Sequence, residues 1–325
     1  MSLGLLFSPQ GSQAVGMGRE LADAWPTARA VFAEADDALG WSVSTVCWQG
    51  PAERLDDTRQ TQPCLVTTSL AALAALREAC ADADMSLDPA LVAGHSVGEY
   101  AALAAVGVVS TADALRLVTR RGELMAEAGV EGGMAAVIGL EREAVAEVVH
   151  RVANAHELVV ANDNAPGQIV VSGTPEALTR ATDALSAAGA RRVIPLRVSG
   201  PFHSPLMASI GDELARAFGS VDWSNAYPPL VSNVTAEPVS NAGEIRDLLA
   251  RQVSAPVEWV ASIRRMRDAG VDTFVECGPG NALSGMVRRI APEVRTLSVS
   301  DPGTLQATVQ ALLEVPEHVA TEVSA

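Results

Sequence analysis

Short apolar runs alternate with longer segments of helical periodicity along most of the chain. The apolar runs predict buried strands at Leu3–Phe7, Ala90–Ala93, Leu230–Val234, Thr273–Cys277 and Arg295–Val299. The helical segments are Arg19–Ala24, Ala28–Leu39, Pro63–Ala83, Glu99–Val106, Ala112–Ala128, His203–Phe218, Ala242–Arg251, Val257–Ala269 and Thr304–Leu313, and one further helix is expected to end at Arg289. Strands and helices that alternate in this way are typical of an α/β fold.

The pattern changes in the middle of the chain, where short strands and two helices follow in the order β-α-β-β-α-β. The strands are expected at Met134–Leu140, Leu158–Ala161, Ile169–Ser172 and Arg192–Val198, and the helices at Arg142–Ala153 and from Thr174 to Ala188. Turn residues 162–167 are expected to separate the second and third strands. This order is that of a ferredoxin-like unit. We therefore expect a small subdomain at 131–198, inserted into a larger domain formed by 1–130 and 199–325, with a disordered tail at 314–325.

Composition and charge exclude several classes of protein. The chain has 325 residues, a net charge of −16 and no lysine. Such a charge argues against a nucleic-acid partner, and any anion site must use arginine or backbone N–H groups. We find no apolar run of the ~18 residues that a membrane span needs, and no basic segment of a signal peptide at the N-terminus. The four cysteines lack metal-ligand spacing, which indicates a reducing, cytoplasmic compartment and no bound metal.

The most informative motif is Gly94-His95-Ser96-Val97-Gly98, a G-x-S-x-G sequence between an expected strand and an expected helix. A serine on such a strand-to-helix turn exposes its hydroxyl, and the helix N-terminus offers N–H donors to an oxyanion. We therefore interpret Ser96 as a nucleophile. The alternative is a tight glycine turn whose serine takes no part in chemistry.

A serine nucleophile needs a general base, and the chain has five histidines. His95 adjoins the serine and is expected to point away from it. His150 and His156 lie in the small subdomain outside its apolar stripe, and His318 lies in the tail. His203 remains, at an expected loop-to-helix junction, and by elimination it is the predicted base; the alternative is a core histidine. The order serine-then-histidine fits an α/β-hydrolase-like domain, but no aspartate stands out as a third member.

At this point the chain resembles the malonyl-CoA:acyl carrier protein transacylases and the acyltransferase domains of polyketide synthases. The matching segments run nearly from end to end: Phe7–Gln13 (FSPQGSQ, against FPGQGSQ), Thr61–Pro63 (TQP), Gly94–Tyr100 (GHSxGEY), Arg121–Met125 (RGxxM), Gly132–Val137, Asn162–Ser172, Gly200–His203 (GPFH), Ser232–Thr235 and Glu276–Gly280. Together these segments are far more specific than the serine motif alone.

The resemblance implies a role for each matching position. Ser96 is the acyl-bearing nucleophile and His203 the base, which the backbone carbonyl of Gln252 orients. Arg121, which would otherwise be interpreted as a helix-surface charge, pairs with the free carboxylate of a malonyl group. The remaining assignments are the oxyanion-hole N–H groups of Gln10 and Val97, the acyl-pocket residue Gln62, the pocket-narrowing Phe202, and the coenzyme A or pantetheine contacts Asn162 and Asn164.

The expected activity is a ping-pong malonyl transfer from malonyl-CoA to the phosphopantetheine thiol of an acyl carrier protein, in fatty acid or polyketide biosynthesis. Coenzyme A thioester is then a substrate, no cofactor is bound, and the protein is expected to be a monomer. Two alternatives stay open: transfer of a different acyl unit between carrier proteins, and hydrolysis of acyl thioesters. Ser8-Pro9, which replaces the Pro-Gly of the family loop, leaves the first open; a carboxylate-binding Arg121 argues against the second.

The carrier protein is acidic in this family, so a local basic face must meet it. The candidate groups are Arg191-Arg192, Arg264-Arg265-Arg267 and Arg288-Arg289. Each could equally be an ordinary solvated helix surface, and no motif in the sequence selects one of them.

Overall fold

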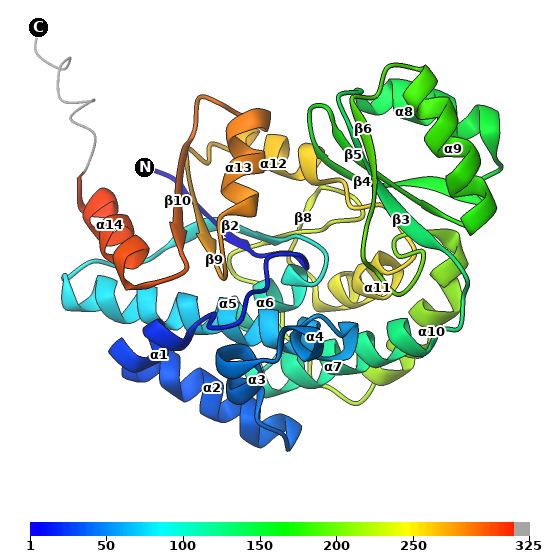
Figure 1. The fold of residues 1–325 in the computed structure, drawn as a ribbon. Helices are drawn as coiled ribbons and strands as arrows, with labels where there is room; N and C mark the ends of the chain where they lie inside the picture. Colours follow the sequence, from blue (N-terminus) through cyan, green and yellow to red (C-terminus); the bar gives the residue numbers. More distant parts are fainter. Residues whose placement is uncertain (315–325) are drawn as a thin grey trace, which may run out of the picture.

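A six-stranded sheet forms the centre of the larger part of the molecule (Figure 1). The computed structural model describes residues 1–314. The sheet has the order β10-β9-β1-β2-β7-β8, and its pairs are parallel except for β7 with β8. The strands are β1 (Leu3–Phe7), β2 (Pro89–Gly94), β7 (Leu230–Val231), β8 (Pro238–Val239), β9 (Thr273–Cys277) and β10 (Arg295–Val299). Every residue of β1 is buried, as expected for a parallel strand covered on both faces.

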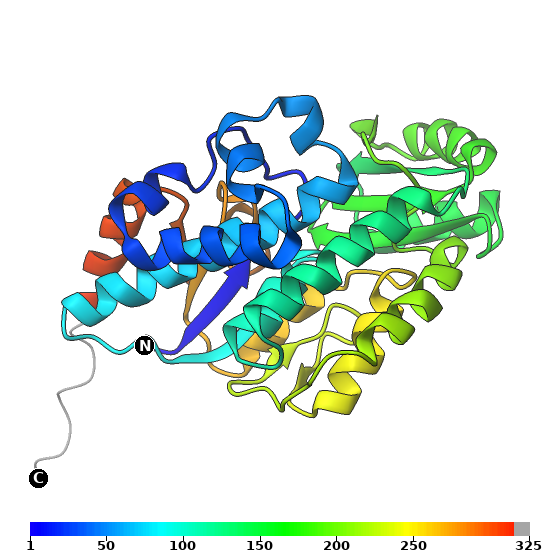
Figure 2. The same ribbon diagram turned by 90° about the horizontal axis from the view of Figure 1, so that it is seen from below.

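Helices cover both faces of this sheet (Figures 1 and 2). They are α1 (Arg19–Ala24), α2 (Pro26–Leu39), α3 (Val43–Gln49), α4 (Ala52–Leu55), α5 (Thr58–Asp82), α6 (Gly98–Ala105), α7 (Thr111–Glu127), α10 (Ala208–Phe218), α11 (Ala242–Gln252), α12 (Trp259–Asp268), α13 (Ala282–Ile290) and α14 (Pro302–Leu313). One hydrophobic core joins the sheet to α2, α5, α6 and α7, and a second joins it to α12 and α13. The mixed α/β class expected from the sequence is confirmed.

A separate four-stranded antiparallel sheet is built from residues 133–195. Its order is β4-β5-β3-β6, with α8 and α9 packed on one face (Figure 1). The elements are β3 (Gly133–Ile138), α8 (Arg142–Val152), β4 (Leu158–Ala165), β5 (Gln168–Gly173), α9 (Pro175–Ala187) and β6 (Arg192–Pro195). Thr174 caps α9 by accepting from the N–H of Ala177, in agreement with the Thr-Pro pattern in the sequence.

Two local expectations from the sequence are wrong. The expected turn at 162–167 shrinks to Pro166-Gly167, because β4 continues through Asn162 to Ala165, where it pairs with β5 and forms a bridge to Val257. The helix expected from His203 begins later: a 3₁₀ turn (η1, Pro205–Met207) precedes α10. His203 has a φ of +58°, which a right-handed helix does not allow.

A third correction concerns α5, which is long and apolar enough to cross a membrane by length and composition. The apolar run is not recognisable in the sequence because threonine, glutamine and arginine interrupt it. In the structure 72% of the relevant window is buried, and α5 packs between α2 and α7 as a core helix. Residues 315–325, most of the tail expected to be disordered and including His318, lie outside the described residues.

Candidate active site

The carboxyl ends of the central strands bring the site together. Phe7 at the end of β1 pairs with Gly94 at the end of β2 and with Cys277 at the end of β9. The loops that follow these three strands therefore leave the sheet at one edge, and open parallel sheets bind ligands at this edge. Ser96 lies in the second of these loops.

Ser96 stands on a sharp turn between β2 and α6, with a φ of +52°. A Cβ on Gly94 would overlap the backbone of Gly98, and one on Gly98 would overlap the carbonyl of Phe7, so both positions need glycine. Asn233 holds this turn from the other side. Its Oδ1 accepts from the Ser96 N–H at 2.6 Å, and its Nδ2 donates to the Gly94 carbonyl at 2.7 Å.

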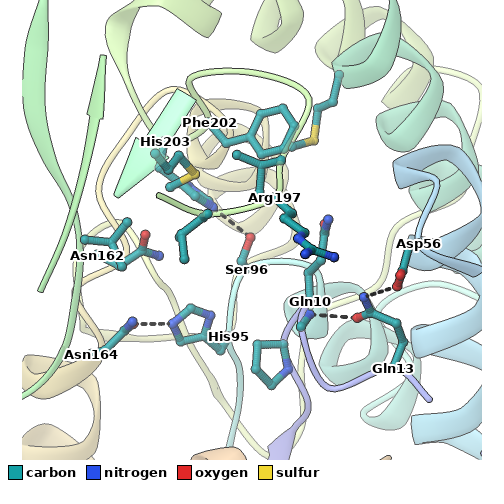
Figure 3. A pocket seen from close by; sticks show the side chains of 17 residues that line it. Gln10, Gln13, Asp56, His95, Ser96, Asn162, Asn164, Arg197, Phe202 and His203 are labelled. Carbon is teal, nitrogen blue, oxygen red and sulfur yellow. Dashed lines mark hydrogen bonds between the residues drawn. The ribbon is translucent and has the colours of Figure 1, made fainter. Parts of the chain in front are cut away.

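His203 faces the serine hydroxyl, with 2.7 Å between Ser96 Oγ and His203 Nε2 (Figure 3). Its Nδ1 lies 2.9 Å from the Gln252 carbonyl oxygen and 3.2 Å from that of Ala255. Carbonyl oxygens only accept, so Nδ1 carries the proton and Nε2 offers its lone pair to the serine. Burial, assisted by the positive charge of Arg121, lowers the pKa of His203 to about 3. The imidazole is therefore neutral at physiological pH.

Arg121 projects from α7 toward the same hydroxyl and is 1% exposed. Its Nη2 donates to Ser96 Oγ and to Gln252 Oε1, both at 3.1 Å, and its Nη1 donates to Gln62 Oε1 at 2.8 Å. Within residues 1–314 no carboxylate oxygen lies within 4 Å of this guanidinium. Burial lowers its pKa. A buried cation held only by neutral groups is a strong attractor for an anion.

A cavity of about 430 Å³ opens above the serine and holds most of the residues singled out from the sequence (Figure 3). Gln10, His95, Ser96, Asn162, Asn164, Phe202 and His203 all line it. Phe202 is 3% exposed. His95 bonds through Nε2 to Asn164 Oδ1 at 2.8 Å and stacks edge-on against Trp259, so its ring is turned to the β4 side of the cavity.

Gln10 and Val97 lie in the loops after β1 and β2, and Gln10 lines the cavity together with Ser96. In the described part of the chain neither of their backbone N–H groups donates to a protein acceptor. The first loop is fixed by Gln13, which accepts from the Gly11 N–H at 2.7 Å and donates to Asp56 at 2.9 Å. Ser8 is 1% exposed and packs against the Gly278 turn, so the changed residue fits the loop.

Four residues of the site were not identified from the sequence as acting there. They are Asn233, Glu99, the side chain of Gln252, and Arg197 at the cavity rim. Asn233 and Glu99 lie inside segments that match the family motifs, so the motifs could have indicated that these two residues belong to the site. Arg197 carries no motif, and the strand expected at 192–198 ends at Pro195, which leaves it in an exposed loop.

Comparison with known proteins gives consistent matches over nearly the full length. The sequence matches the acyl transferase domain family over residues 5–315. It is 41% identical over 315 residues to the malonyl CoA-acyl carrier protein transacylase of Bacillus subtilis, covering 96% of this chain and 98% of the relative. The protein of that name from Escherichia coli K12 is 40% identical over 307 residues, which cover 94% of this chain and 98% of the relative.

Solved structures agree with this result. The acyl-carrier-protein S-malonyltransferase of Burkholderia pseudomallei has a TM-score of 0.91 at 37% identity, covering 95% of this chain and 100% of that one. A malonyl-transacylase solved with a type II polyketide acyl carrier protein has a TM-score of 0.90 at 38% identity, and the match covers 96% of this chain and 100% of that one.

Proposed function

This chain belongs to the acyl transferase domain family, and we propose on that premise that it is a malonyl-CoA:acyl carrier protein transacylase. It is an acyltransferase that moves a malonyl group from malonyl-CoA to the phosphopantetheine thiol of an acyl carrier protein. The observation that carries this assignment is the buried Arg121 guanidinium, 3.1 Å from the serine hydroxyl and without a carboxylate partner within residues 1–314. A malonyl group supplies that carboxylate, whereas an acetyl group does not.

In the acylation step, Ser96 Oγ attacks the thioester carbonyl carbon while His203 Nε2 takes the hydroxyl proton. The negative charge that develops on the carbonyl oxygen is met by the N–H groups of Gln10 and Val97. The carbon–sulfur bond then breaks, and His203 returns the proton to the coenzyme A sulfur. The Gln252 carbonyl, 2.9 Å from Nδ1, holds the ring in the tautomer that this step needs.

Selection for malonyl follows from the groups around Arg121. Gln62 and Gln252 fix the guanidinium through their side-chain oxygens. The guanidinium is therefore held in place before the malonyl carboxylate arrives, and little further ordering of Arg121 is needed on binding. Phe202 limits the width of the pocket beside His203, which favours an unbranched malonyl chain over methylmalonyl.

The second half of the reaction repeats the first with another thiol. A phosphopantetheine arm enters the cavity, and its sulfur attacks the carbonyl carbon of the malonyl ester while His203 Nε2 takes the thiol proton. The ester carbon–oxygen bond then breaks, and His203 returns the proton to Ser96 Oγ. Asn162 and Asn164 are buried on β4 and line the cavity, which supports their proposed contacts with the amide groups of the arm. Transfer to a thiol then competes with hydrolysis, so the lifetime of the malonyl-serine separates a transferase from a hydrolase.

We further propose the finer fold assignment expected from the sequence. The sheet of residues 133–195 has the spatial order second-third-first-fourth with helices on one face, which supports a ferredoxin-like subdomain at 131–198. The six-stranded sheet with its serine turn supports an α/β-hydrolase-like domain from 1–130 and 199–325. We propose that the protein acts as a cytoplasmic monomer without a bound cofactor or metal, and without a nucleic-acid or membrane partner.

The test is acylation of the intact protein by malonyl-, methylmalonyl- and acetyl-CoA, followed by mass spectrometry. We expect a malonyl adduct that is absent in Ser96→Ala and that disappears when an acyl carrier protein is added, with transfer of the same mass to that protein. His156→Ala, at an exposed histidine in the turn before β4, is the matched control for His203→Ala. Preferred acetyl labelling, or rapid loss of the adduct to water alone, would contradict the proposal.

A further inference from the structure

A buried carboxyl group shares a hydrogen-bond donor with the backbone of the nucleophile and takes no part in the steps described above. Glu99 stands in the first turn of α6, three residues after Ser96, and is 2% exposed. Its Oε2 accepts from Gln252 Nε2 at 2.5 Å. It does not line the cavity, and its side chain bonds to the Gln252 amide instead.

The side chain of Gln252 connects this carboxyl group to the arginine. Its Oε1 accepts from Arg121 Nη2 at 3.1 Å, while its Nε2 donates to Glu99 and to the Ser96 carbonyl oxygen, the latter at 2.9 Å. A guanidinium only donates and an ionised carboxylate only accepts, so this amide orientation satisfies both at once. Glu99 and Arg121 are thus joined through one fully buried amide.

The charges of these buried groups balance only in the absence of a substrate carboxylate. Glu99 as a carboxylate and Arg121 as a cation sum to zero. A malonyl carboxylate on Arg121 adds a second negative charge, and an uncompensated buried charge is costly. We propose that Glu99 balances Arg121 in the free enzyme and takes up one proton from solvent when a carboxylated acyl group pairs with that arginine. This inference rests on the malonyl specificity proposed above.

The neighbouring groups favour this proton uptake. Burial raises the pKa of Glu99 to about 7, against the lowering effects of Gln252, the Asn233 N–H and the charge of Arg121. Once the malonyl carboxylate pairs with Arg121, that last effect is lost and the pKa rises further. Of the other titratable groups nearby, burial raises the pKa of Tyr100 on α6 and lowers that of His203, so both are neutral at pH 8. The adjacent strands β1 and β2 carry no charged residue.

The direct readout is the number of protons taken up when malonyl-CoA binds to the Ser96→Ala variant, in which no thioester is cleaved. Binding heats in two buffers of different ionisation enthalpy at pH 8 give this number. A group with a pKa of about 7 is about 90% ionised at pH 8, so we expect close to one proton per malonyl-CoA bound. Binding of acetyl-CoA, the matched ligand without the carboxylate, should cause no proton uptake.

Two further measurements keep the test independent of any single variant. By linkage, the Kd of malonyl-CoA for Ser96→Ala should rise about tenfold from pH 8 to pH 9, while that of acetyl-CoA stays unchanged. Adding Glu99→Gln should abolish both the proton uptake and this pH dependence. If that double variant does not fold, the pH series on Ser96→Ala stands on its own.

The outcomes separate this inference from the proposed function. Malonyl-CoA that acylates wild-type Ser96 but binds Ser96→Ala without proton uptake overturns the role of Glu99 alone. Proton uptake that persists in Ser96→Ala/Glu99→Gln also overturns it, because another group would then carry the proton. Failure of malonyl-CoA to acylate the wild-type protein would contradict the proposed function itself.

Discussion

Replacement of Arg121 by glutamine is the sharpest test of how this site chooses its acyl group. The substitution removes the charge but keeps an amide that can donate to Gln62 or Gln252. Arg121 is 1% exposed, so solvent does not screen its pairing with a carboxylate. Two charge-assisted hydrogen bonds contribute about 1.5–3 kcal/mol each, together about 3–6 kcal/mol. Water that enters the variant pocket offsets part of this loss, and we expect kcat/KM for malonyl-CoA to fall about 10²–10³-fold.

The assay is single-turnover acylation by malonyl-CoA and by acetyl-CoA, followed by intact-protein mass. Acylation by acetyl-CoA should change by no more than about threefold, because an acetyl group makes no ionic contact with Arg121. Arg120→Gln is the matched control: its side chain is 43% exposed and pairs with Glu123 on the surface of the same helix. An equal loss with both thioesters would refute the reasoning, since Arg121 would then serve only to hold Ser96.

Three further predictions concern the base, the pocket width and the carrier protein. Because the pKa of His203 is lowered to about 3, the imidazole stays neutral in mild acid, and the rate of acylation by malonyl-CoA should stay constant from pH 7 to pH 5. If the base had a pKa of 6.5, its neutral fraction, and with it the acylation rate, would fall about 25-fold over this range. The Phe202→Ala variant should raise the ratio of methylmalonyl to malonyl labelling about tenfold, because accommodating one methyl group changes the binding free energy by about 1–3 kcal/mol. An unchanged ratio would show that Phe202 does not limit the width of the acyl pocket. Charge reversal of Arg191 and Arg192 should slow malonyl transfer to the carrier protein at low salt without slowing self-acylation by malonyl-CoA. Arg246→Glu on α11 is the control, and an equal loss of both rates would exclude this patch.

The choice among the three basic patches comes from the structure. Arg265 pairs with Glu237, and Arg267 pairs with Asp268 and Glu293, which neutralises much of that group. Arg289 is engaged by Gln168 and the Pro166 carbonyl. Within the described chain, Arg191 and Arg192 have no carboxylate within 4 Å. They lie at the start of β6, and the other end of this strand leads to Arg197 at the cavity rim, where a carrier protein must approach.

Elements with a strong local signal were predictable from the sequence. Leu3–Phe7, Thr273–Cys277 and Arg295–Val299 were predicted with the bounds that the structure has, because apolar runs of this length between turn residues have few alternatives. The strand-to-helix position of Ser96 was likewise determined by local pattern, with glycines at Gly94 and Gly98 where any side chain would overlap the backbone.

Other features depended on partners distant in the sequence. Asn162 and Asn164 look like turn residues, yet they lie in β4 because its backbone pairs with β5 and with the Val257 segment. No periodicity predicts this, since polar residues enter a strand when tertiary contacts satisfy them. His203 similarly leaves the expected helix, because its ring is held between Ser96 and the Gln252 carbonyl.

The sequence by itself thus determined the α/β class, the serine turn and, through its motifs, several of the residues that meet around Ser96. Only the tertiary structure decided how these residues act on one another. Arg121 bonds to Gln62 and Gln252, which are 59 and 131 residues away, and Gln252 bonds to Glu99 across 153 residues. The physical reason is burial: polar groups removed from water must find partners, and only the folded chain determines which groups are within reach.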